Sequence, residues 1–364
     1  MSGSGLRGRA RSVLENALTG AGSALDRGAM RLIQRAMQSN RRPPPRRMED
    51  ARARLVSLAE HYARVEPSFF AAPPAPEVVE RTLPPRAGAA EVADLSWPSL
   101  YRPSWPGYGE ELAKYGANAT ARARIYRGEG SGRPVVICLH GWGAGQPWID
   151  ERAFVLSYLV RIGLDPILFQ LPFHGERAPV QARRSGSLFL TAHLVRTNEA
   201  FGQAVFDLRQ LVMHARASGA PAVGVLGMSL GSYVTALWAG LDRDLAFAGT
   251  LIPAVSMGSL WWSHGSGSEQ QRAAQKAGVS AELLDRVFAV HAPLSRPPLL
   301  AREQLFIAAA LGDRITPPEQ ARQLWRHWGE PTAVWLKGGH LAQVDRGDAF
   351  RSLRRWLHTL GLAR

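Results

Sequence analysis

The chain has 364 residues, of which 46% are apolar and 20% are charged. This balance is typical of a globular protein, and it excludes a collagen-like repeat, a disulfide mini-scaffold and wholesale disorder. Cys138 is the only cysteine, so neither an intramolecular disulfide nor a multi-cysteine zinc site can form. No window approaches the ~18 consecutive apolar residues of a membrane-spanning helix, and the N-terminal region lacks the apolar core of a secretory signal. We therefore expect a cytoplasmic protein.

Positive charge is concentrated near the N-terminus. Lys and Arg number 44 against 30 Asp and Glu, which gives a net charge of +14. Residues 1–47 contain ten arginines, and Glu15 and Asp26 are their only acids, so this segment alone carries +8. The rest of the chain is only mildly basic. More than half of the net positive charge therefore belongs to the N-terminal segment.

Residues 1–47 are predicted to form a basic amphipathic helix. Leu25, Leu32 and Ile33 recur at helical spacing on one face, and arginines occupy the other. Such a helix suits a peripheral contact with an anionic membrane, docking on a partner, packing on its own domain, or a role as a transit peptide. Nucleic-acid binding is disfavoured, because no aromatic residue interleaves the arginines before Tyr62.

The sequence divides into three parts. After the N-terminal segment, residues 48–92 are predicted to form a helix over Met48–Val65 and then a Pro-rich linker. Residues 93–364 alternate apolar strand-like runs with helical segments, which is typical of an α/β domain with a doubly wound, mostly parallel sheet. The expected strands are Ala121–Tyr126, Val135–Leu139, Pro166–Leu171, Ala222–Leu226, Phe247–Ile252, Leu305–Leu311 and Thr332–Leu336.

A G-x-S-x-G motif occupies residues 227–231, directly after the expected strand Ala222–Leu226 and before a helical run. In this context the serine lies on a sharp, strained turn, and the glycines avoid collisions with the neighbouring strand and helix. The turn directs the hydroxyl of Ser229 out of the sheet. It also places the following backbone N–H groups at a helix N-terminus, where negative charge is stabilised.

Two further residues complete a Ser-His-Asp constellation. Asp313 follows the expected strand Leu305–Leu311, and His340 follows the strand Thr332–Leu336. Serine is a weak nucleophile at neutral pH, so it requires a base, and the imidazole requires a carboxylate that fixes its tautomer and stabilises its cation. Each residue alone has a structural explanation. Their joint occurrence after strands, in the order serine, acid, histidine, predicts a catalytic triad of Ser229, Asp313 and His340.

An oxyanion hole is predicted beside this triad. One donor would be the backbone N–H of Leu230, and the second would be the backbone N–H of Trp142, in the loop that follows the strand Val135–Leu139. In the same loop, His140 is interpreted as a structural residue, because His340 already supplies the base. The loop does not fit a dinucleotide fingerprint, because Gln146 replaces the third glycine.

At these residues the sequence resembles the α/β-hydrolase superfamily, over roughly residues 96–360. The resemblance implies a doubly wound, eight-stranded sheet with Ser229 as nucleophile, Asp313 as acid and His340 as base. The runs 171–179 and 251–256 loosely resemble the branch named after α/β-hydrolase domain-containing protein 18. The segment 257–298 lies where the superfamily usually carries a helical cap.

Four residues are candidates for substrate binding. His174 and Arg177 follow the expected strand Pro166–Leu171, and Trp261 and Trp262 lie in the expected cap. An arginine there could receive an anionic group, and exposed tryptophans would suit an acyl chain. Loop geometry and core packing explain the same residues equally well. No cofactor and no metal site are expected, since no His-x-x-x-His or Cys-x-x-Cys spacing occurs.

The sequence thus predicts a serine hydrolase that cleaves a carboxylic ester of a small-molecule or lipid substrate through an acyl-enzyme on Ser229. An acyltransferase on the same fold is the first alternative, because the access of water decides between the two acceptors. A catalytically silent α/β-hydrolase fold, recruited to a membrane or partner by its basic N-terminal helix, is the second. The sequence leaves the acyl group, the alcohol and the oligomeric state open.

Overall fold

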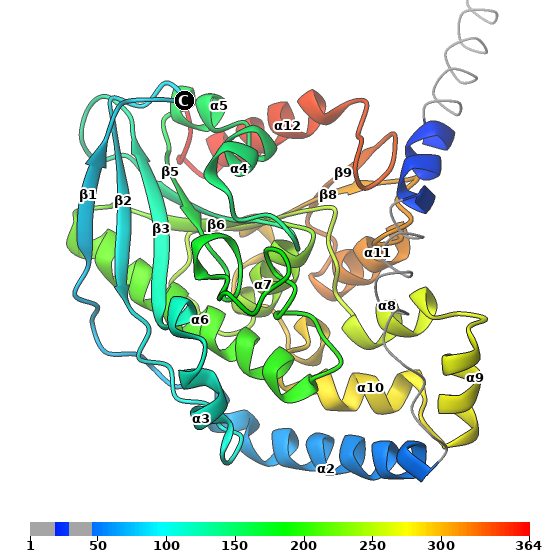
Figure 1. Ribbon diagram of the computed structural model, residues 1–364. Coiled ribbons are helices and arrows are strands. Elements are labelled where there is room, and N and C mark those ends of the chain that lie inside the picture. Colours follow the sequence, from blue (N-terminus) through cyan, green and yellow to red (C-terminus); the bar gives the residue numbers. More distant parts are fainter. Residues whose placement is uncertain (1–18, 29–45) are drawn as a thin grey trace, which may run out of the picture.

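The computed structural model describes residues 19–28 and 46–364. In these residues a nine-stranded sheet forms the centre of the molecule, with strand order β1-β2-β3-β5-β4-β6-β7-β8-β9 (Figure 1). The first three strands are antiparallel, β5 is antiparallel to β3, and the remaining pairs are parallel. The strands are β1 (Val79–Leu83), β2 (Glu91–Pro98), β3 (Thr120–Arg127), β4 (Val135–Leu139), β5 (Asp165–Phe169), β6 (Val223–Met228), β7 (Ala248–Leu251), β8 (Leu305–Ala310) and β9 (Thr332–Leu336).

The sheet confirms the predicted fold class and corrects its strand number. All seven strands expected from the sequence are present, but the resemblance implied eight strands and the structure has nine. The additional edge strand β1 lies inside the stretch that we predicted as a Pro-rich linker. Four of its five residues are exposed, and two of them are charged, so it has no apolar run that would identify it.

Helices cover both faces of the sheet. They are α2 (Arg46–Phe69), α3 (Tyr108–Ala113), α4 (Pro147–Ala153), α5 (Leu156–Arg161), α6 (Leu194–Ala217), α7 (Leu230–Ala239), α8 (Met257–His264), α9 (Glu269–Lys276), α10 (Ala281–Phe288), α11 (Pro318–His327) and α12 (Arg346–Thr359). Short 3₁₀ turns occupy Gly116–Ala119, Gly175–Arg177, Ala289–His291, Pro293–Ser295 and Arg302–Gln304. Side chains of α6, α7 and α11 belong to one hydrophobic core, and those of α5 and α12 belong to a second.

Strand β4 shows why both faces are apolar. All five of its residues are buried, and alternate side chains point to opposite faces of the sheet. Ile137 and Leu139 lie in the core under α6 and α7, whereas Val136 and Cys138 lie in the core under α5 and α12. A continuous apolar run of this length is therefore what a strand covered on both sides requires.

The N-terminal part of the chain differs from its prediction. Residues 19–28 are helical, but the remainder of the predicted basic helix over 1–47 lies outside the described residues. Within the helical segment Leu25, which we placed on the apolar face, is 58% exposed, whereas the polar Ser23 and Asp26 are buried. Polar contacts with loops of the main domain thus decide which face of this helix is covered. The next helix, predicted over Met48–Val65, is longer than expected and packs against α10.

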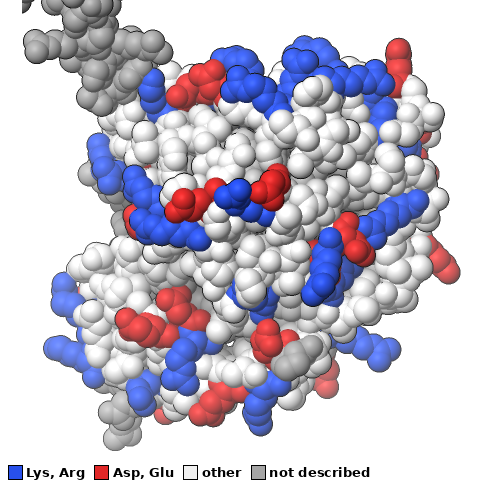
Figure 2. Space-filling model, turned by 180° about the vertical axis from the view of Figure 1, so that it is seen from behind, with Lys and Arg blue, Asp and Glu red and all other residues white. Residues whose placement is uncertain are grey.

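Charges of both signs are mixed on one face of the described part of the chain. On the face that Figure 2 shows, Lys and Arg side chains lie interspersed with Asp and Glu. Many of the ion pairs are close, such as Arg124 with Asp94 at 2.6 Å and Arg209 with Asp242 at 2.8 Å. Among residues 19–28 and 46–364, no helix combines the length and the apolar character needed to cross a membrane.

Candidate active site

Ser229 lies on a strained turn between β6 and α7. Its backbone has φ 54° and ψ −114°, a conformation that few residues other than glycine adopt. The two glycines of the motif are sterically required. A Cβ on Gly227 would collide with the backbone of Gly231 and with Thr235, and a Cβ on Gly231 would collide with the carbonyl of Leu139 in β4. The turn therefore exists because this motif leaves room for it.

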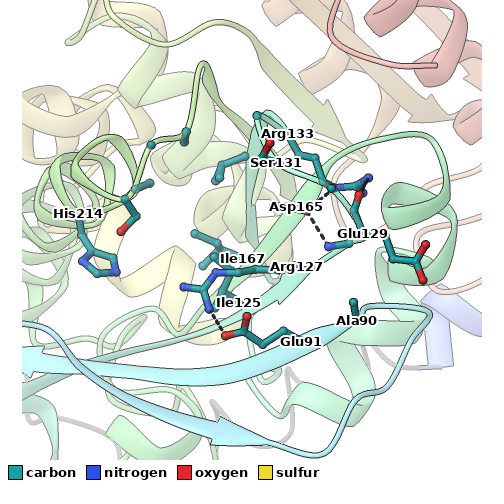
Figure 3. Close-up of a pocket in the computed structure, with 18 residues that line it drawn as sticks. Ala90, Glu91, Ile125, Arg127, Glu129, Ser131, Arg133, Asp165, Ile167 and His214 are labelled. Carbon is teal, nitrogen blue, oxygen red and sulfur yellow. Dashed lines mark hydrogen bonds and ion pairs between the residues drawn. The ribbon is translucent and has the colours of Figure 1, made fainter.

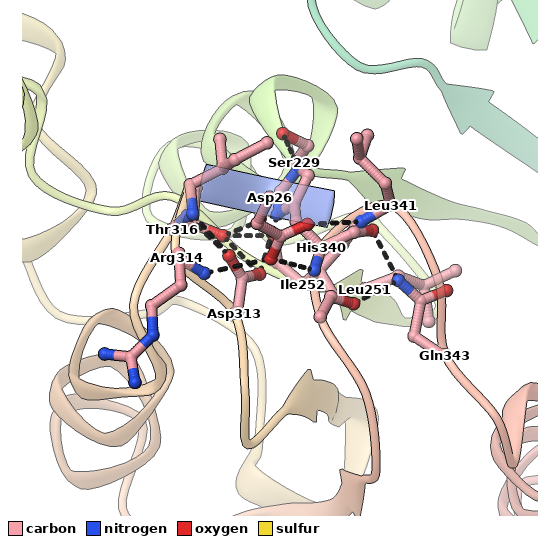
Figure 4. Close-up of polar contacts among 12 residues, drawn as sticks. Asp26, Ser229, Leu251, Ile252, Asp313, Arg314, Thr316, His340, Leu341 and Gln343 are labelled. Atoms are coloured by element: carbon pink, nitrogen blue, oxygen red, sulfur yellow. Dashed lines mark hydrogen bonds and ion pairs between the residues drawn. The ribbon is translucent and has the colours of Figure 1, made fainter. Parts of the chain in front are cut away.

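The three predicted catalytic residues form one continuous hydrogen-bonded chain. The hydroxyl of Ser229 lies 2.9 Å from His340 Nε2, and His340 Nδ1 lies 2.7 Å from Asp313 Oδ2 (Figure 4). Because a carboxylate only accepts, Nδ1 carries the proton and Nε2 is free to accept the serine proton. Asp313 is fully buried and His340 is 9% exposed, so the chain runs from the interior to the edge of the sheet.

The acid is held by its own loop. Asp313 Oδ1 accepts hydrogen bonds from the backbone N–H groups of Ile315 at 2.9 Å and Thr316 at 2.7 Å. The hydroxyl of Thr316 lies 2.9 Å from Asp313 Oδ2 and 3.0 Å from His340 Nδ1. These donors stabilise the ionised carboxylate and fix its orientation. No motif in the sequence marks Thr316, and the one local signal is that a short polar side chain such as that of Asp313 often hydrogen-bonds to nearby backbone N–H groups.

The loop after β4 passes beside the nucleophile. A Cβ on Gly141 would lie 3.4 Å from the Cβ of Ser229, which places the predicted donor Trp142 one residue from this contact. The indole of Trp142 is anchored separately, because its Nε1–H donates to the Gly186 carbonyl at 2.8 Å. Leu230 is the first residue of α7, so its N–H lies at a helix N-terminus next to Ser229. Leu230 thus follows the serine directly, and Trp142 follows the glycine that contacts it.

His140 organises this loop from within. Its Nε2 accepts the N–H of Leu171 at 3.1 Å, so Nδ1 carries the proton and donates to the Gly141 carbonyl at 2.9 Å. Burial lowers the pKa of His140 to about 4, which keeps the ring neutral near pH 7. Both nitrogens are thus used in backbone contacts, as expected for the structural role predicted from the sequence.

The structure gives Arg177 a partner inside the protein. Its guanidinium is fully buried, forms an ion pair with Asp207 at 2.7 Å, and donates to the Gln170 and Asn118 carbonyls. These contacts argue against the predicted contact with an anionic substrate. His174 is also fully buried, with Nδ1 2.9 Å from the Pro172 carbonyl. Burial lowers the pKa of His174 well below its usual value. Neither side chain belongs to the hydrogen-bonded chain of Ser229, His340 and Asp313, which is called the relay below.

The expected cap segment 257–298 is helical and contains α8, α9 and α10. Trp261 packs the edge of its ring against Phe288, with centroids 5.7 Å apart, and belongs to the margin of a hydrophobic core. Its neighbour Trp262 is partly buried, and its carbonyl accepts a hydrogen bond from Gln271. The ring of His264 at the end of α8 lies 3.0 Å from the Ile315 carbonyl, which ties the segment to the loop of Asp313. Substrate contact by the tryptophans stays a prediction.

A surface cavity of about 640 Å³ lies far from this site, at the amino ends of β4 and β5 (Figure 3). Its arginines already have partners. Arg127 pairs with Glu80 and Glu91, and Arg133 pairs with Asp165 at 2.6 Å. In open α/β sheets ligands bind at the carboxyl ends of the strands, where Ser229 lies. Within residues 19–28 and 46–364, no group of three His, Cys, Asp or Glu side chains is arranged to hold a metal ion.

Solved structures identify the fold. The chain resembles acetyl xylan esterase 1 from a Thermoanaerobacterium species with a TM-score of 0.53 and 16% identity, over 81% of this chain and 92% of that one. It resembles an acetyl xylan esterase from a Paenibacillus species with a TM-score of 0.55 and 13% identity, over 84% of this chain and 93% of that one. The protein has the α/β-hydrolase fold.

Sequence relatives define the family. No family model matches the chain. The chain belongs to the family of uncharacterized protein Rv2627c from Mycobacterium tuberculosis, to which it is 30% identical over 329 residues, 89% of this chain and 78% of that protein. Uncharacterized protein MT2702, from another strain of that organism, is 30% identical over 302 residues, 82% of this chain and 71% of that protein. These comparisons give no support to the finer resemblance to the branch of α/β-hydrolase domain-containing protein 18.

Proposed function

We propose that the protein is a serine hydrolase that cleaves a carboxylic ester through an acyl-enzyme on Ser229. One observation carries this proposal: the hydroxyl, the imidazole and the carboxylate form an unbroken hydrogen-bonded chain at a strained turn. Core packing has no need for these three groups together, and the strain at Ser229 serves no packing purpose. Strained non-glycine residues of this kind cluster at active sites.

The reaction follows from the geometry. As Ser229 Oγ attacks the ester carbonyl, its proton passes to His340 Nε2, 2.9 Å away. Asp313 stabilises the imidazolium and holds the ring in place. When the tetrahedral intermediate collapses, the bond to the alcohol oxygen breaks and His340 returns the proton to that oxygen. Water then attacks the acyl-enzyme and gives a proton to the same nitrogen. When the second tetrahedral intermediate collapses, the bond to Ser229 Oγ breaks and His340 returns the proton to that oxygen. The carboxylic acid is released and the serine hydroxyl is restored.

The negative charge of the intermediate would be stabilised by the backbone N–H groups of Trp142 and Leu230. Two observations support this assignment: the loop after β4 contacts Ser229 at Gly141, one residue before Trp142, and Leu230 is the first residue of α7, whose dipole favours an anion. Loss of one such donor typically lowers the rate about 100- to 1,000-fold.

Short acyl esters are the first substrates to test. The two solved structures named above are acetyl xylan esterases by name, so acetyl esters are a reasonable starting point. The purified protein is incubated with a fluorophosphonate probe and with nitrophenyl esters of increasing acyl length. We expect labelling and turnover in the native protein, and loss of both in Ser229→Ala.

Ser259→Ala supplies a matched control, because Ser259 is an exposed serine on α8 outside the hydrogen-bonded chain. This variant should keep both labelling and turnover. Labelling that persists in Ser229→Ala would contradict the proposed nucleophile. A native protein that neither reacts with the probe nor turns over any ester would favour the silent binding fold instead.

A further inference from the structure

The helical residues 19–28 lie against the two loops that carry the acid and the base, although about 290 residues of sequence separate them. The hydroxyl of Ser23 donates to the Gly312 carbonyl at 2.6 Å, next to Asp313. The N–H of Gly338 lies 3.4 Å from the hydroxyl of Thr19. In Figure 1 this helix stands beside the end of β9 and above α11, and in Figure 4 it passes behind His340.

Asp26 joins the two loops with one carboxylate. Its Oδ2 accepts the backbone N–H of His340 at 2.6 Å and the backbone N–H of Arg314 at 3.0 Å. Its Oδ1 accepts the N–H of Leu341 at 3.1 Å. The side chain is completely buried. A buried carboxylate is costly unless it is hydrogen-bonded, and here three backbone donors satisfy it.

The contact surface is shaped for close approach. A Cβ on Gly339 would meet the Asp26 carboxylate and the backbone of Gly22, and a Cβ on Gly22 would meet the backbone of Gly339. A Cβ on Gly312 would lie 2.7 Å from the hydroxyl of Ser23 and from the methyl group of Thr19. Glycines on both sides of the contact thus let the helix reach the loops, which a loosely placed terminal segment would not require.

The position of these bonds bears on the relay. Asp26 binds the backbone of the same residue whose ring bridges Ser229 and Asp313, and also the residue after Asp313. The ring of His340 must stay within hydrogen-bond reach of both neighbours, and small displacements of catalytic groups are costly in rate. A tie between the two loops limits how far the ring can move away from the carboxylate.

We propose that Asp26 is a positioning residue of the active site. It holds the loop of His340 and the loop of Asp313 together, so that the two side chains stay within hydrogen-bond distance. This inference rests on the proposed hydrolase function. Among the roles that the sequence left open for the N-terminal segment, this inference favours packing on its own domain for residues 19–28.

The test compares Asp26→Asn with Glu199→Gln in the full chain. Glu199 is the matched control: it is another buried carboxylate that accepts two backbone N–H groups, from Ser104 and Trp105, and it lies outside the relay. Active sites are counted with the fluorophosphonate probe, and kcat and KM for nitrophenyl acetate are expressed per reactive site. Because unfolded molecules neither react with the probe nor turn over the ester, partial unfolding does not change kcat per reactive site.

We expect kcat per reactive site to fall about 10- to 100-fold in Asp26→Asn, with KM changed less than about threefold. The expected fall follows from the cost of misplacing a catalytic group by about 1 Å, which reaches about 100-fold in rate. Glu199→Gln should lower the melting temperature and leave kcat per site unchanged. Equal kcat per site in the native protein and Asp26→Asn would overturn the proposal. So would an equal fall in both variants.

A second measurement separates this proposal from the proposed function. In protein labelled with ¹⁵N-histidine, the Nδ1–H signal of His340 is assigned by its absence in His340→Ala. It should be sharp in the native protein and in Glu199→Gln, and broadened or lost in Asp26→Asn. This readout needs no turnover, so an inactive native protein with the expected signals would contradict the hydrolase and support the positioning. A signal unchanged in Asp26→Asn would contradict the positioning alone.

Discussion

Two sets of histidines near the carboxyl end of the sheet use the same ring in opposite ways. His340 lies between a carboxylate and a hydroxyl, at 2.7 and 2.9 Å, and is 9% exposed. His140 and His174 lie only 4.8 Å apart, centroid to centroid, but both rings are buried and their hydrogen bonds are to backbone groups. The neighbours of an imidazole, rather than its place in the sheet, therefore decide whether it can move protons.

Removing His340 should have the largest effect on activity. With no base, the hydroxyl of Ser229 keeps its proton, so we expect His340→Ala to lower kcat about 10⁵- to 10⁶-fold for nitrophenyl acetate. Far-ultraviolet circular dichroism should be unchanged, because His340 lies on a loop. If folded His174→Gln lost as much activity as His340→Ala, the distinction between His340 and the buried histidines would be wrong.

Removing the charge of Asp313 tests the role of the carboxylate beside His340. Asp313→Asn would leave a neutral amide beside Nδ1 and favour the wrong tautomer of His340, so we expect kcat to fall about 10⁴-fold while KM changes little. The measurement is steady-state hydrolysis at pH 7 to 9. Activity within tenfold of the native protein would mean that the carboxylate does not support the base.

Burial of His140 should make the protein less stable in acid. The pKa of His140 is lowered to about 4 by burial, below the ~6.5 of an unfolded chain, so the unfolded state binds the proton first. The stabilising contribution is present above about pH 6.5 and is lost as the pH falls toward 4. Between pH 7 and pH 5 this linkage lowers the free energy of unfolding by about 2 kcal/mol.

Urea unfolding at both pH values measures this effect. His140→Gln should show a smaller acid-induced loss than the native protein, by about the same 2 kcal/mol. His358 is exposed on α12, so His358→Gln should retain the native pH dependence. An identical pH dependence in His140→Gln and the native protein would show that the ring of His140 takes up no proton on unfolding.

Thr316 should give the smallest effect. Its hydroxyl contacts both Asp313 and His340, but two backbone N–H groups already hold the carboxylate. We expect Thr316→Val, which keeps the shape and removes the hydroxyl, to lower kcat about tenfold, because one hydrogen bond to a charged group contributes roughly 1.5 kcal/mol or somewhat more. Steady-state kinetics test it, and a loss as large as that of Asp313→Asn would make the hydroxyl part of the proton relay.

Seven of the nine strands, and the positions of Ser229, Asp313 and His340 after strands, were predictable because their signals are local. An apolar run followed by a glycine, an acid or a histidine marks the end of a buried strand, and parallel strands bring these ends together. Strand β2 was missed because polar residues interrupt its apolar ones, and its first and last residues are exposed. Arg177 looked available in the sequence, yet its ion pair with Asp207 depends on a helix thirty residues further along.

Asp26 shows the limit of local signals. It is separated from His340 by 314 positions, and no motif links them. The clue in the sequence was that Asp26 is one of two acids in a segment dominated by arginine, but periodicity drew attention to the apolar face of Leu25, which is exposed. Which face of a short helix is buried depends on the surface that receives it, and here that surface consists of loop backbone rich in N–H donors.

The edge strand β1 has a consequence for self-association. Exposed strand edges can recruit strands from other molecules and so start aggregation. On β1, Arg81 pairs with Asp94 at 2.7 Å, and Glu80 pairs with Arg127 across the strands. An incoming strand would have to strip water from these charges, and it would find only five residues to pair with. The short length and the charges of β1 thus oppose intermolecular strand pairing at this border of the sheet.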